Sequence, residues 1–499
     1  MTARHACHHG MTKAKGCEHV AVGHFSKLFP DLPGLALSEE EAAILGGPGG
    51  LMHDFDDASP DSAIPAGYIF FAQFVDHDVT LDTTSDLRGA PLDAASIAKL
   101  PNIRSASLDL DCVYGFGPEA SPHIYDGEHI AVSPDGRDLA RAPGGAALIG
   151  DPRNDENLFI SQMQLMFHRA HNRFFDERVH QRAPKERFSR FAAAQRELRF
   201  HYQWIVLFDF LKRLCDVDIW RFAATRICDP KAKFPLCYGP DKHGALPMPV
   251  EFSVAAYRVG HTMVRSVFSV NDAHREVELF DERFGSTGFA ALPEGLEVDW
   301  KHMLPLDQHH RPRMAKAIDP LLTDELQDLP VVPSRNPANR ALAFRNLMRA
   351  NALSVPSGQA VAAALKAKGY PLEVCDLKLD DVPGWKRLDA AHRTGKSLRE
   401  ETPLFYYMLR ESELKSCGQR LGPVGSAMLM EVFGGMLKLC GTSFVTAEPG
   451  WQPDPCVSKE KYGWWAETYR EGFDKSALIG NPDYYPLELA DLARFAAGG

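Results

Sequence analysis

Gln73-Phe74-Val75-Asp76-His77-Asp78 is the stretch of this chain that says most about its fold. It places a histidine between two aspartates, with a glutamine four residues before the histidine. Residues four apart lie on one face of a helix, so Gln73 and His77 are expected to point the same way. A neutral histidine accepts and returns a proton near pH 7, and adjacent acids can fix its surroundings. The stretch therefore predicts a helix that carries a general base.

The composition is that of an ordinary globular protein. The 499 residues are 45% hydrophobic and 24% charged, which suits several domains or one large helical domain around a cofactor. A net charge of −11 without a long basic run argues against binding to nucleic acid or to a membrane surface. No apolar run is long enough for a membrane span, and residues 1–34 lack a signal-peptide core. We therefore expect a cytoplasmic protein, with non-classical secretion left open.

The ten cysteines favour reduced thiols over a disulfide framework, because they are spread along the chain without a tight repeat. No C-x-x-C-H is present, which excludes c-type haem attachment. Residues near the N-terminus could ligate a soft metal, but their irregular spacing favours a tail without one. These residues are Cys7, His8, His9, Cys17 and His19.

Helical patterns dominate the middle and the C-terminal part of the chain. Asp151 is a predicted cap and Pro152 a predicted first helical residue, before an apolar stripe that continues to Phe174. Further helices are predicted over 404–416, after Thr402 and Pro403 and before Gly418, and over 426–437. Strand signals are sparse and short, so the fold class is mainly α with very little β.

The domain organisation follows from composition. Residues 1–66 are rich in Gly, Pro and His and are predicted to form an N-terminal arm. Residues 67–499 show no internal repeat and no low-complexity linker, so we expect them to form one large helical domain.

A second segment offers a fixed positive charge. A general base can act together with such a cation, which stabilises negative charge on a leaving oxygen. Arg153, in Gly150-Asp151-Pro152-Arg153-Asn154-Asp155-Glu156-Asn157, is the candidate for this charge. Alone, an arginine in a first helical turn is usually a solvated charge, and a histidine between aspartates is usually a surface residue. The two motifs together, in this order, favour a common site.

Both segments resemble the animal-type haem peroxidase (peroxidase–cyclooxygenase) superfamily. Gln73–Asp78 resembles its distal haem motif, and the segment from Gly150 resembles the family pattern as far as His171-Asn172-Arg173. The resemblance implies a single myeloperoxidase-like helical domain with haem between a distal and a proximal helix. It also implies that His77 is the acid–base catalyst, with Arg153 beside it and Gln73 lining the distal cavity.

The resemblance extends to the links between protein and haem. Members of the family attach haem through esters from two carboxylates, whose positions match Asp76 and Glu156. Haem b and ester-linked haem are therefore both open, and Glu156 can also be a helix-dipole acid. Asn157 stands where the most oxidising members carry a methionine, so no sulfonium link is expected. Iodide, thiocyanate or phenols should then be easier substrates than chloride.

Ser105-Ala106-Ser107-Leu108-Asp109-Leu110-Asp111 alternates oxygen-bearing and other residues, and Ca²⁺ prefers six to eight oxygen ligands. The alternative is a half-buried strand with exposed acids. The resemblance implies a calcium site, and an ion there would pin the distal base because Asp78 adjoins His77. The implied ligands are Asp78, Ser105, Ser107 (through its carbonyl), Asp109 and Asp111, the last of which is a serine in well-known members.

Ala256-Tyr257-Arg258-Val259-Gly260-His261-Thr262-Met263-Val264 resembles the proximal segment of the family. The resemblance makes His261 the ligand of the haem iron and Arg258 a propionate partner; read alone, His261 is a packed helical histidine. In the later segment 344–349, Asn346 is expected to accept a hydrogen bond from His261, and Arg349 to be a second propionate partner. The following residues, 350–356, depart from the Arg-Asp-His-Gly-Leu-Pro of most members.

Taken together, these assignments predict a haem peroxidase that reduces hydrogen peroxide, oxidises a small donor (halide, thiocyanate or phenol) and takes part in the response to oxidative stress. The alternative is a fatty-acid dioxygenase of the same superfamily, which needs a tyrosine radical beside the haem. In the prostaglandin-synthase type this tyrosine lies three residues before the proximal histidine, where this chain has Arg258; Tyr257 is one residue further away. A role in cell adhesion is disfavoured because no Arg-Gly-Asp occurs.

Overall fold

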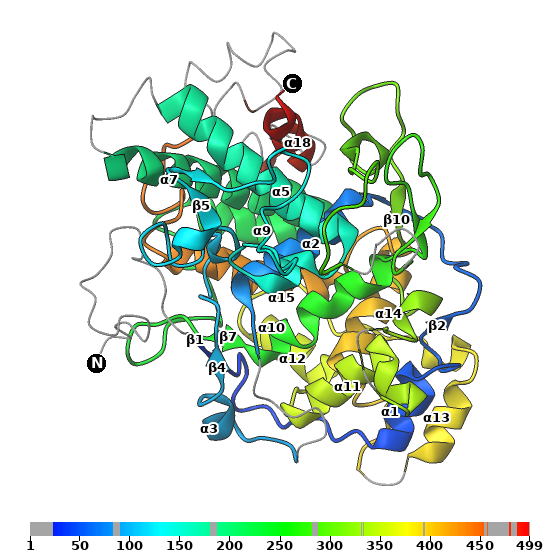
Figure 1. Cartoon of the computed structure of the whole chain (residues 1–499). Helices are drawn as coiled ribbons and strands as arrows, with labels where there is room; N and C mark the ends of the chain where they lie inside the picture. The colour runs from blue at the N-terminus through cyan, green and yellow to red at the C-terminus, as the bar shows by residue number, and fades with distance from the viewer. Residues whose placement is uncertain are drawn as a thin grey trace.

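The fold is mainly α-helical, as predicted (Figure 1). The computed structural model describes residues 23–82, 90–179, 187–281, 288–330, 332, 334–392, 395–453, 457, 479–480 and 487–498. The N-terminal Cys and His residues considered as metal ligands lie outside these residues. The longer helices are α2 (Gly67–Val79), α5 (Leu158–Arg173), α7 (Arg187–Ile205), α9 (Val217–Cys228), α11 (Leu342–Ala352), α12 (Gly358–Ala367), α14 (Leu404–Ser416), α15 (Pro423–Leu439) and α18 (Leu489–Ala497). Shorter helices are α1 (Glu39–Gly46), α3 (Ala94–Ile97), α4 (Asp111–Tyr114), α8 (Leu211–Leu214), α10 (Val250–Ser253) and α13 (Trp385–Ala391).

The strands are short and connect distant parts of the chain. β1 (Gly23–Ser26) lies between β4 (Pro101–Asn102) and β7 (Met248–Pro249). The other sheets described have two strands each, which agrees with the prediction of little β. They pair β3 (Asp61–Pro65) with β10 (Met314–Lys316), β2 (His53–Asp54) with β11 (Leu322–Thr323), β5 (Tyr125–Asp126) with β6 (His129–Ile130), and β8 (Val267–Phe268) with β9 (Val277–Glu278).

Helix α2, which carries the opening motif, is the central element of the fold (Figure 1). It is buried on nearly every side, as expected for a helix that is apolar around its circumference. Phe70 stacks on Phe159 of α5 with ring centroids 4.6 Å apart, and Phe74 stacks on Phe167 at 4.2 Å. These aromatic contacts hold α2 against α5, so the distal motif and the arginine segment come together.

The segment before α5 differs from the predicted helix start. Asp151 caps a 3₁₀ turn, η2 (Pro152–Asp155), by accepting a hydrogen bond from the backbone N–H of Arg153. Helix α5 begins only at Leu158, after Asn157, whose side chain accepts from the backbone N–H of Ile160. The segment thus has two caps, and the turn between them carries the polar residues of the site. The predicted helix over 404–416 is α14, and the one over 426–437 lies within α15.

The described part of the predicted N-terminal arm, residues 23–66, packs against the body of the molecule. Phe25, Leu45 and Met52 are buried in the main hydrophobic core. Helix α1 lies beside α11 and α13, as the blue and yellow-green helices of Figure 1 show. Apolar side chains in a Gly- and Pro-rich stretch are enough to anchor it once partners exist elsewhere in the chain. Among the described residues, no helix has both the length and the apolar character needed to cross a membrane.

Candidate active site

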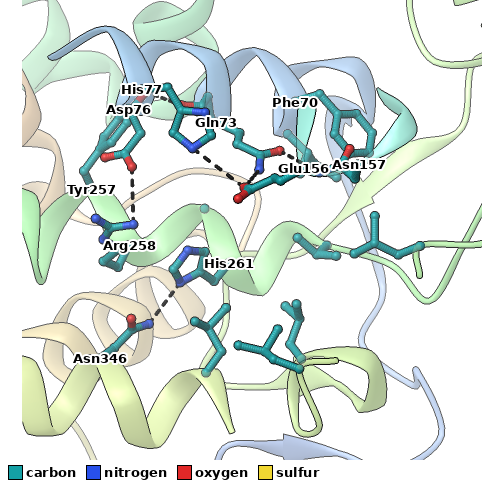
Figure 2. A pocket seen from close by; sticks show the side chains of 18 of the residues that line it. Phe70, Gln73, Asp76, His77, Glu156, Asn157, Tyr257, Arg258, His261 and Asn346 are labelled. Carbon is teal, nitrogen blue, oxygen red and sulfur yellow. Dashed lines mark hydrogen bonds and ion pairs between the residues drawn. The ribbon is translucent and has the colours of Figure 1, made fainter. Parts of the chain in front are cut away.

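A cavity of about 310 Å³ opens between α2 and the 3₁₀ helix η5 (Ala256–Met263). His77 comes from α2 and His261 from η5, and Figure 2 shows Asn346 beside His261. The lining combines polar and apolar side chains. The predicted residues that line it are Gln73, Asp76, His77, Glu156, Arg258, His261 and Asn346, and the apolar ones include Phe70, Val264, Leu279, Phe280, Leu326 and Leu329.

His77 is held as a neutral base. Its Nδ1 lies 2.7 Å from Oδ1 of Asn154, and because an amide oxygen only accepts, Nδ1 carries the proton. Nε2 is then the free acceptor, 3.8 Å from Oε1 of Glu156. Burial, reinforced by the charge of Arg153, lowers the pKa of His77 to about 4. The ring is therefore neutral at pH 7, and its Nε2 is ready to accept a proton.

Gln73 lies beside His77 in the cavity, as the helical spacing predicts. Its Nε2 donates to Oε1 of Glu156 at 2.5 Å, and its Oε1 accepts from Nδ2 of Asn157 at 3.4 Å (Figure 2). Burial raises the pKa of Glu156 above its usual value, with Arg153 opposing the shift. Asn157 thus has two contacts, one to Gln73 and one that caps α5.

Asp76 and Arg258 bond to each other across the cavity. Arg258 Nη1 lies 3.3 Å from Asp76 Oδ2 (Figure 2). Thr80 Oγ1 donates to Asp76 Oδ1 at 3.0 Å. Burial favours the protonated form of Asp76, but the charge of Arg258 and its other neighbours keep the pKa of Asp76 below its usual value. An ionised carboxylate and a guanidinium therefore join α2 to η5.

Arg153 differs from its expected placement beside the ring of His77. Its Nη2 donates to the carbonyls of His77 (3.2 Å) and Thr80 (2.6 Å), and it pairs with Asp151 at 2.7 Å. The guanidinium is drawn to the carbonyl end of α2, where the last carbonyls of the helix lack backbone partners. It lines a neighbouring cavity instead of the one that His77 lines. Its charge reaches His77 through space, not through contact with the ring.

His261 is partly buried and neutral. Burial, followed by the charge of Arg258, lowers the pKa of His261 to about 3. The Asn346 amide lies 3.0 Å from Nδ1 with its nitrogen toward the ring; a half turn of the amide would bring its oxygen there, as an imidazole protonated on Nδ1 requires. A Cβ built on Gly260 would meet no atom within 4 Å, so space is open next to His261.

A second cavity of about 250 Å³ adjoins the first and is rich in arginine. The two cavities share Leu342, Arg258 and Asn346. Arg349, one of the predicted propionate partners, lies here with Nη1 2.9 Å from Oδ2 of Asp82. The arginines that line this cavity are Arg153, Arg258, Arg345 and Arg349.

The donor set of the two cavities fits a haem. An apolar macrocycle needs an apolar lining and an axial imidazole, and its two carboxylates need cations at one edge. The first cavity supplies the apolar lining and His261, and the adjoining cavity supplies the arginines. Neither Arg345 nor Asn154 was predicted from the sequence to belong to the site. Asn154 lies within the quoted arginine segment, but no spacing rule marked it as a partner of His77.

Three buried acids form a cluster that includes Asp78, the residue that follows His77. The carboxylates of Asp78, Asp109 and Asp111 have oxygens within 4.8 Å of one another. Burial, then the neighbouring acids, raises the pKa of Asp78 to about 8, and burial likewise raises that of Asp109 to about 7 and that of Asp111 to about 8. Among the described residues, Oδ1 of Asp78 and Oδ1 of Asp109 are buried without a hydrogen-bond partner. Such an oxygen-only cluster is the donor set of a hard cation.

The two serines of this loop are placed differently. Ser105 Oγ donates to Asp109 Oδ2 at 2.8 Å, so it is part of the acid cluster. Ser107 Oγ lies 3.3 Å from Sγ of Cys440, so its hydroxyl is turned toward that thiol. The alternative of a strand with exposed acids does not hold, because Asp109 and Asp111 are buried and the segment is not a strand.

Tyr257, considered in the dioxygenase alternative, lines the same cavity as His77. Its ring stacks on Phe252 at 5.2 Å, and its hydroxyl donates to the carbonyl of Ala72 at 3.1 Å. Burial raises the pKa of Tyr257 well above its usual value. The phenol is thus fixed in a packed wall.

Comparisons with known proteins agree with this geometry. Residues 100–360 match the family model for animal haem peroxidase, whereas a search of curated proteins gives no match. The structure is similar to peroxidase A from Dictyostelium discoideum (TM-score 0.56, 14% identity, 95% of this chain and 96% of that one). It is also similar to fatty acid alpha-dioxygenases from Arabidopsis thaliana (0.56, 14%, 92% and 76%) and Oryza sativa (0.58, 15%, 96% and 81%). At these identities the structures show a shared fold, and because the family model covers more than half of the 499 residues, the chain belongs to the animal haem peroxidase family.

Proposed function

We propose that this enzyme is a haem-dependent peroxidase that reduces hydrogen peroxide and oxidises a small electron donor. The observation that carries the proposal is the fixed tautomer of His77, whose free Nε2 belongs to the cavity that also contains His261. Haem, when bound, supplies the redox chemistry of peroxide cleavage and donor oxidation. Removal of hydrogen peroxide by such an enzyme would serve the response to oxidative stress.

The proton transfers belong to His77. Its Nε2 accepts a proton from one oxygen of hydrogen peroxide and returns it to the other oxygen, which leaves as water. Gln73 holds Glu156 beside Nε2, which keeps a polar wall next to the peroxide. Burial, reinforced by the charge of Arg153, lowers the pKa of His77 and so keeps its ring neutral between turnovers.

The cofactor would be held from three sides. His261 would ligate the iron through Nε2, with Asn346 at its other nitrogen. Arg258 and Arg349 would bind the propionates from the arginine-rich cavity. Asp76 and Glu156 are the carboxylates available for ester links, so both haem b and ester-linked haem are compatible with the site.

The donor is proposed to be iodide, thiocyanate or a phenol. Asn157 cannot form a sulfonium link, and its amide is already used by Gln73 and by the cap of α5. A haem without this link is expected to be less oxidising, so chloride should be a poor donor. Efficient chloride oxidation at neutral pH would contradict this part of the proposal.

We also propose a Ca²⁺ ion among Asp78, Asp109 and Asp111, with Ser105 and the carbonyl of Ser107 as further ligands. The buried carboxylate oxygens without partners support it, because such oxygens are costly unless a cation compensates them. Asp78 follows His77 in α2, so the ion would rigidify the part of this helix that carries the catalytic histidine.

The second candidate function is fatty-acid dioxygenation. It is favoured by the structural similarity to fatty acid alpha-dioxygenases and by the presence of Tyr257 in the cavity. We rank it lower because the hydroxyl of Tyr257 is bound to Ala72, and Arg258 stands three residues before His261. Oxygen uptake with a long-chain fatty acid, absent in Tyr257→Phe, would reverse this ranking.

The test compares haem-reconstituted protein with His77→Ala and, as a control, the exposed His309→Ala. We expect a Soret band in all three proteins. His77→Ala should react with hydrogen peroxide about 10²- to 10⁴-fold more slowly, the usual contribution of a positioned general base. Equal rates in His77→Ala and the control would refute the proposal, and so would the failure of the wild-type protein to bind haem.

A further inference from the structure

A chain of buried hydrogen bonds runs from the ring of His77 to the backbone carbonyl of Cys112. We infer that Gln164 is a positioning residue, which fixes the tautomer of His77 by orienting the amide of Asn154. The inference rests on the proposed role of His77 as the proton acceptor and names the residues that keep it in its working form. Gln164 lies on α5 and does not line the cavity.

The chain has three links, and the side chains that form it are fully or almost fully buried. His77 Nδ1 lies 2.7 Å from Asn154 Oδ1. Asn154 Nδ2 donates to Gln164 Oε1 at 2.7 Å. Gln164 Nε2 donates to the backbone carbonyl of Cys112, in α4, at 3.2 Å.

The direction of this chain is set at the carbonyl of Cys112. A carbonyl oxygen only accepts, so Gln164 must turn its NH₂ group toward it and its oxygen toward Asn154. Asn154 must then turn its own NH₂ toward Gln164 and its oxygen toward His77. Nδ1 of His77 must therefore carry the proton, and Nε2 keeps its lone pair for the cavity.

A second carbonyl enforces the same direction. Gln164 Nε2 also lies 2.9 Å from Nε2 of His168, which follows four residues later on the same face of α5. His168 Nδ1 lies 3.3 Å from the carbonyl of Ala131, so Nδ1 is the donor and Nε2 the acceptor. Burial keeps His168 neutral by lowering its pKa to about 4, which leaves Nε2 free to accept.

The consequence concerns the reacting nitrogen. If Asn154 were flipped, its NH₂ would face Nδ1, and the proton of the neutral ring would move to Nε2. His77 could then donate into the cavity but could not accept a proton from hydrogen peroxide. Gln164 prevents this flip because the reversed amide would place two carbonyl oxygens against each other.

The matched variants are Gln164→Leu and Gln164→Glu in the haem-loaded protein. Glutamate in its protonated form can donate to the carbonyl of Cys112 and offer its other oxygen to Asn154, whereas leucine of similar size offers Asn154 no acceptor. Cyanide and carbon monoxide are the probes. Hydrogen cyanide must lose its proton as it binds to ferric haem, so its association needs the base, whereas carbon monoxide binds to ferrous haem without a proton transfer.

We expect Gln164→Leu to slow association of cyanide and of hydrogen peroxide by about three- to tenfold, which corresponds to one neutral hydrogen bond. Gln164→Glu should stay within about twofold of wild type, and carbon monoxide binding should not change in either. Equal effects of the two variants on cyanide would overturn the inference. A parallel loss of carbon monoxide binding would show that Gln164 is only structural, which also overturns it.

A third variant guards against misfolding and separates this inference from the proposed function. Aspartate at position 154 presents an oxygen to His77 in both orientations, so Gln164→Leu should cost nothing further in an Asn154→Asp background. The same loss in both backgrounds would contradict the inference. If His77→Ala leaves cyanide association unchanged, the proposed base is wrong; if His77→Ala slows it and Gln164→Leu does not, only the role of Gln164 is wrong.

Discussion

The two histidines of the cavity are held in different ways. His77, on the distal helix, is fixed through Asn154 to the interior of α5 and lies beside polar side chains. Among the described residues, His261 is hydrogen-bonded to the side chain of Asn346, and the cavity that it lines also has apolar walls. The difference fits their proposed tasks. A base must present a defined lone pair to a substrate that comes and goes, whereas a metal ligand is oriented by the metal that it binds.

The elements that carry the two histidines differ in the same sense. His77 lies in a full α-helix that is buried on nearly every side. His261 lies in a 3₁₀ helix, and open space adjoins Gly260. The only ion pair between the labelled side chains of Figure 2 that joins these two elements is Asp76–Arg258. When haem binds, a propionate would replace Asp76 as the partner of Arg258, so we expect this ion pair to rearrange.

The largest effect is expected from His261→Ala. Loss of the axial ligand should abolish stable haem binding, whereas His77→Ala should keep it, because only the proximal histidine is proposed to ligate iron. The measurement is the Soret absorbance after gel filtration of the reconstituted protein, with His309→Ala as control. If His261→Ala keeps a wild-type spectrum, His261 is not the iron ligand, and the proposed difference between His261 and His77 does not hold.

The next largest effect separates the two asparagines. Asn154→Leu should slow the reaction with hydrogen peroxide by about 10- to 100-fold while leaving haem affinity unchanged, because it removes the acceptor that fixes the base. Asn346→Leu should instead weaken haem retention by about 10- to 100-fold, the usual cost of losing a partner of a metal ligand. Stopped-flow rates and haem transfer to apomyoglobin measure the two quantities. If both variants change the peroxide rate and haem retention to the same extent, the two asparagines do not have the different roles proposed for them.

The two histidines of the site were easier to predict from the sequence than the hydrogen bonds that orient them. The spacing of Gln73 and His77 placed both in the cavity, because helical periodicity is local. The roles of Asn154 and Gln164 were not predictable, since an amide can donate or accept and its direction depends on a backbone carbonyl at Cys112. No local pattern specifies which side of an amide faces a neighbour that is distant in sequence.

The direction of the long side chain of Arg153 was likewise not predictable from local sequence. Its position in the chain was predicted, but its guanidinium turned to the carbonyls of His77 and Thr80 at the end of α2. That acceptor pair exists only because α2 ends beside η2, which is a tertiary contact. The packing of the Gly- and Pro-rich residues 23–66, predicted as part of an arm, is likewise tertiary, since their apolar side chains contact α11 and the rest of the core.

Removal of calcium should affect the distal side more than the proximal side. Chelation should slow the peroxide reaction by about threefold to tenfold, because Asp78 and the α4 carbonyl that anchors Gln164 both adjoin the acid cluster. Asp109→Asn should mimic chelation, and the exposed Asp126→Asn should not. If chelation changes neither the rate nor the stability, the proposed ion is absent.

The acid cluster also predicts how stability depends on pH. Without calcium, the folded-state pKa values of Asp78, Asp109 and Asp111 lie at about 7 to 8, above the ordinary value of 3.8. The unfolded chain then holds fewer protons than the folded one, so stability should fall as the pH rises from about 4 to about 8. Calcium compensates the ionised acids and should remove this fall. Thermal unfolding at about pH 5 and about pH 8, with calcium or chelator, measures it.

The smallest effect is expected from Arg153→Gln, and it decides how this charge acts on the distal side. The neutral form of wild-type His77 persists down to its pKa of about 4, so the peroxide rate should be constant above about pH 5 and fall below it. Without Arg153 the acid limb should move to higher pH but stay below 6.5, because burial is the larger cause of the lowered pKa. The exposed Arg311→Gln should leave the profile unchanged. A uniform loss of about 10²- to 10³-fold at every pH would mean instead that Arg153 contacts the leaving oxygen, with its side chain turned into the cavity during the reaction.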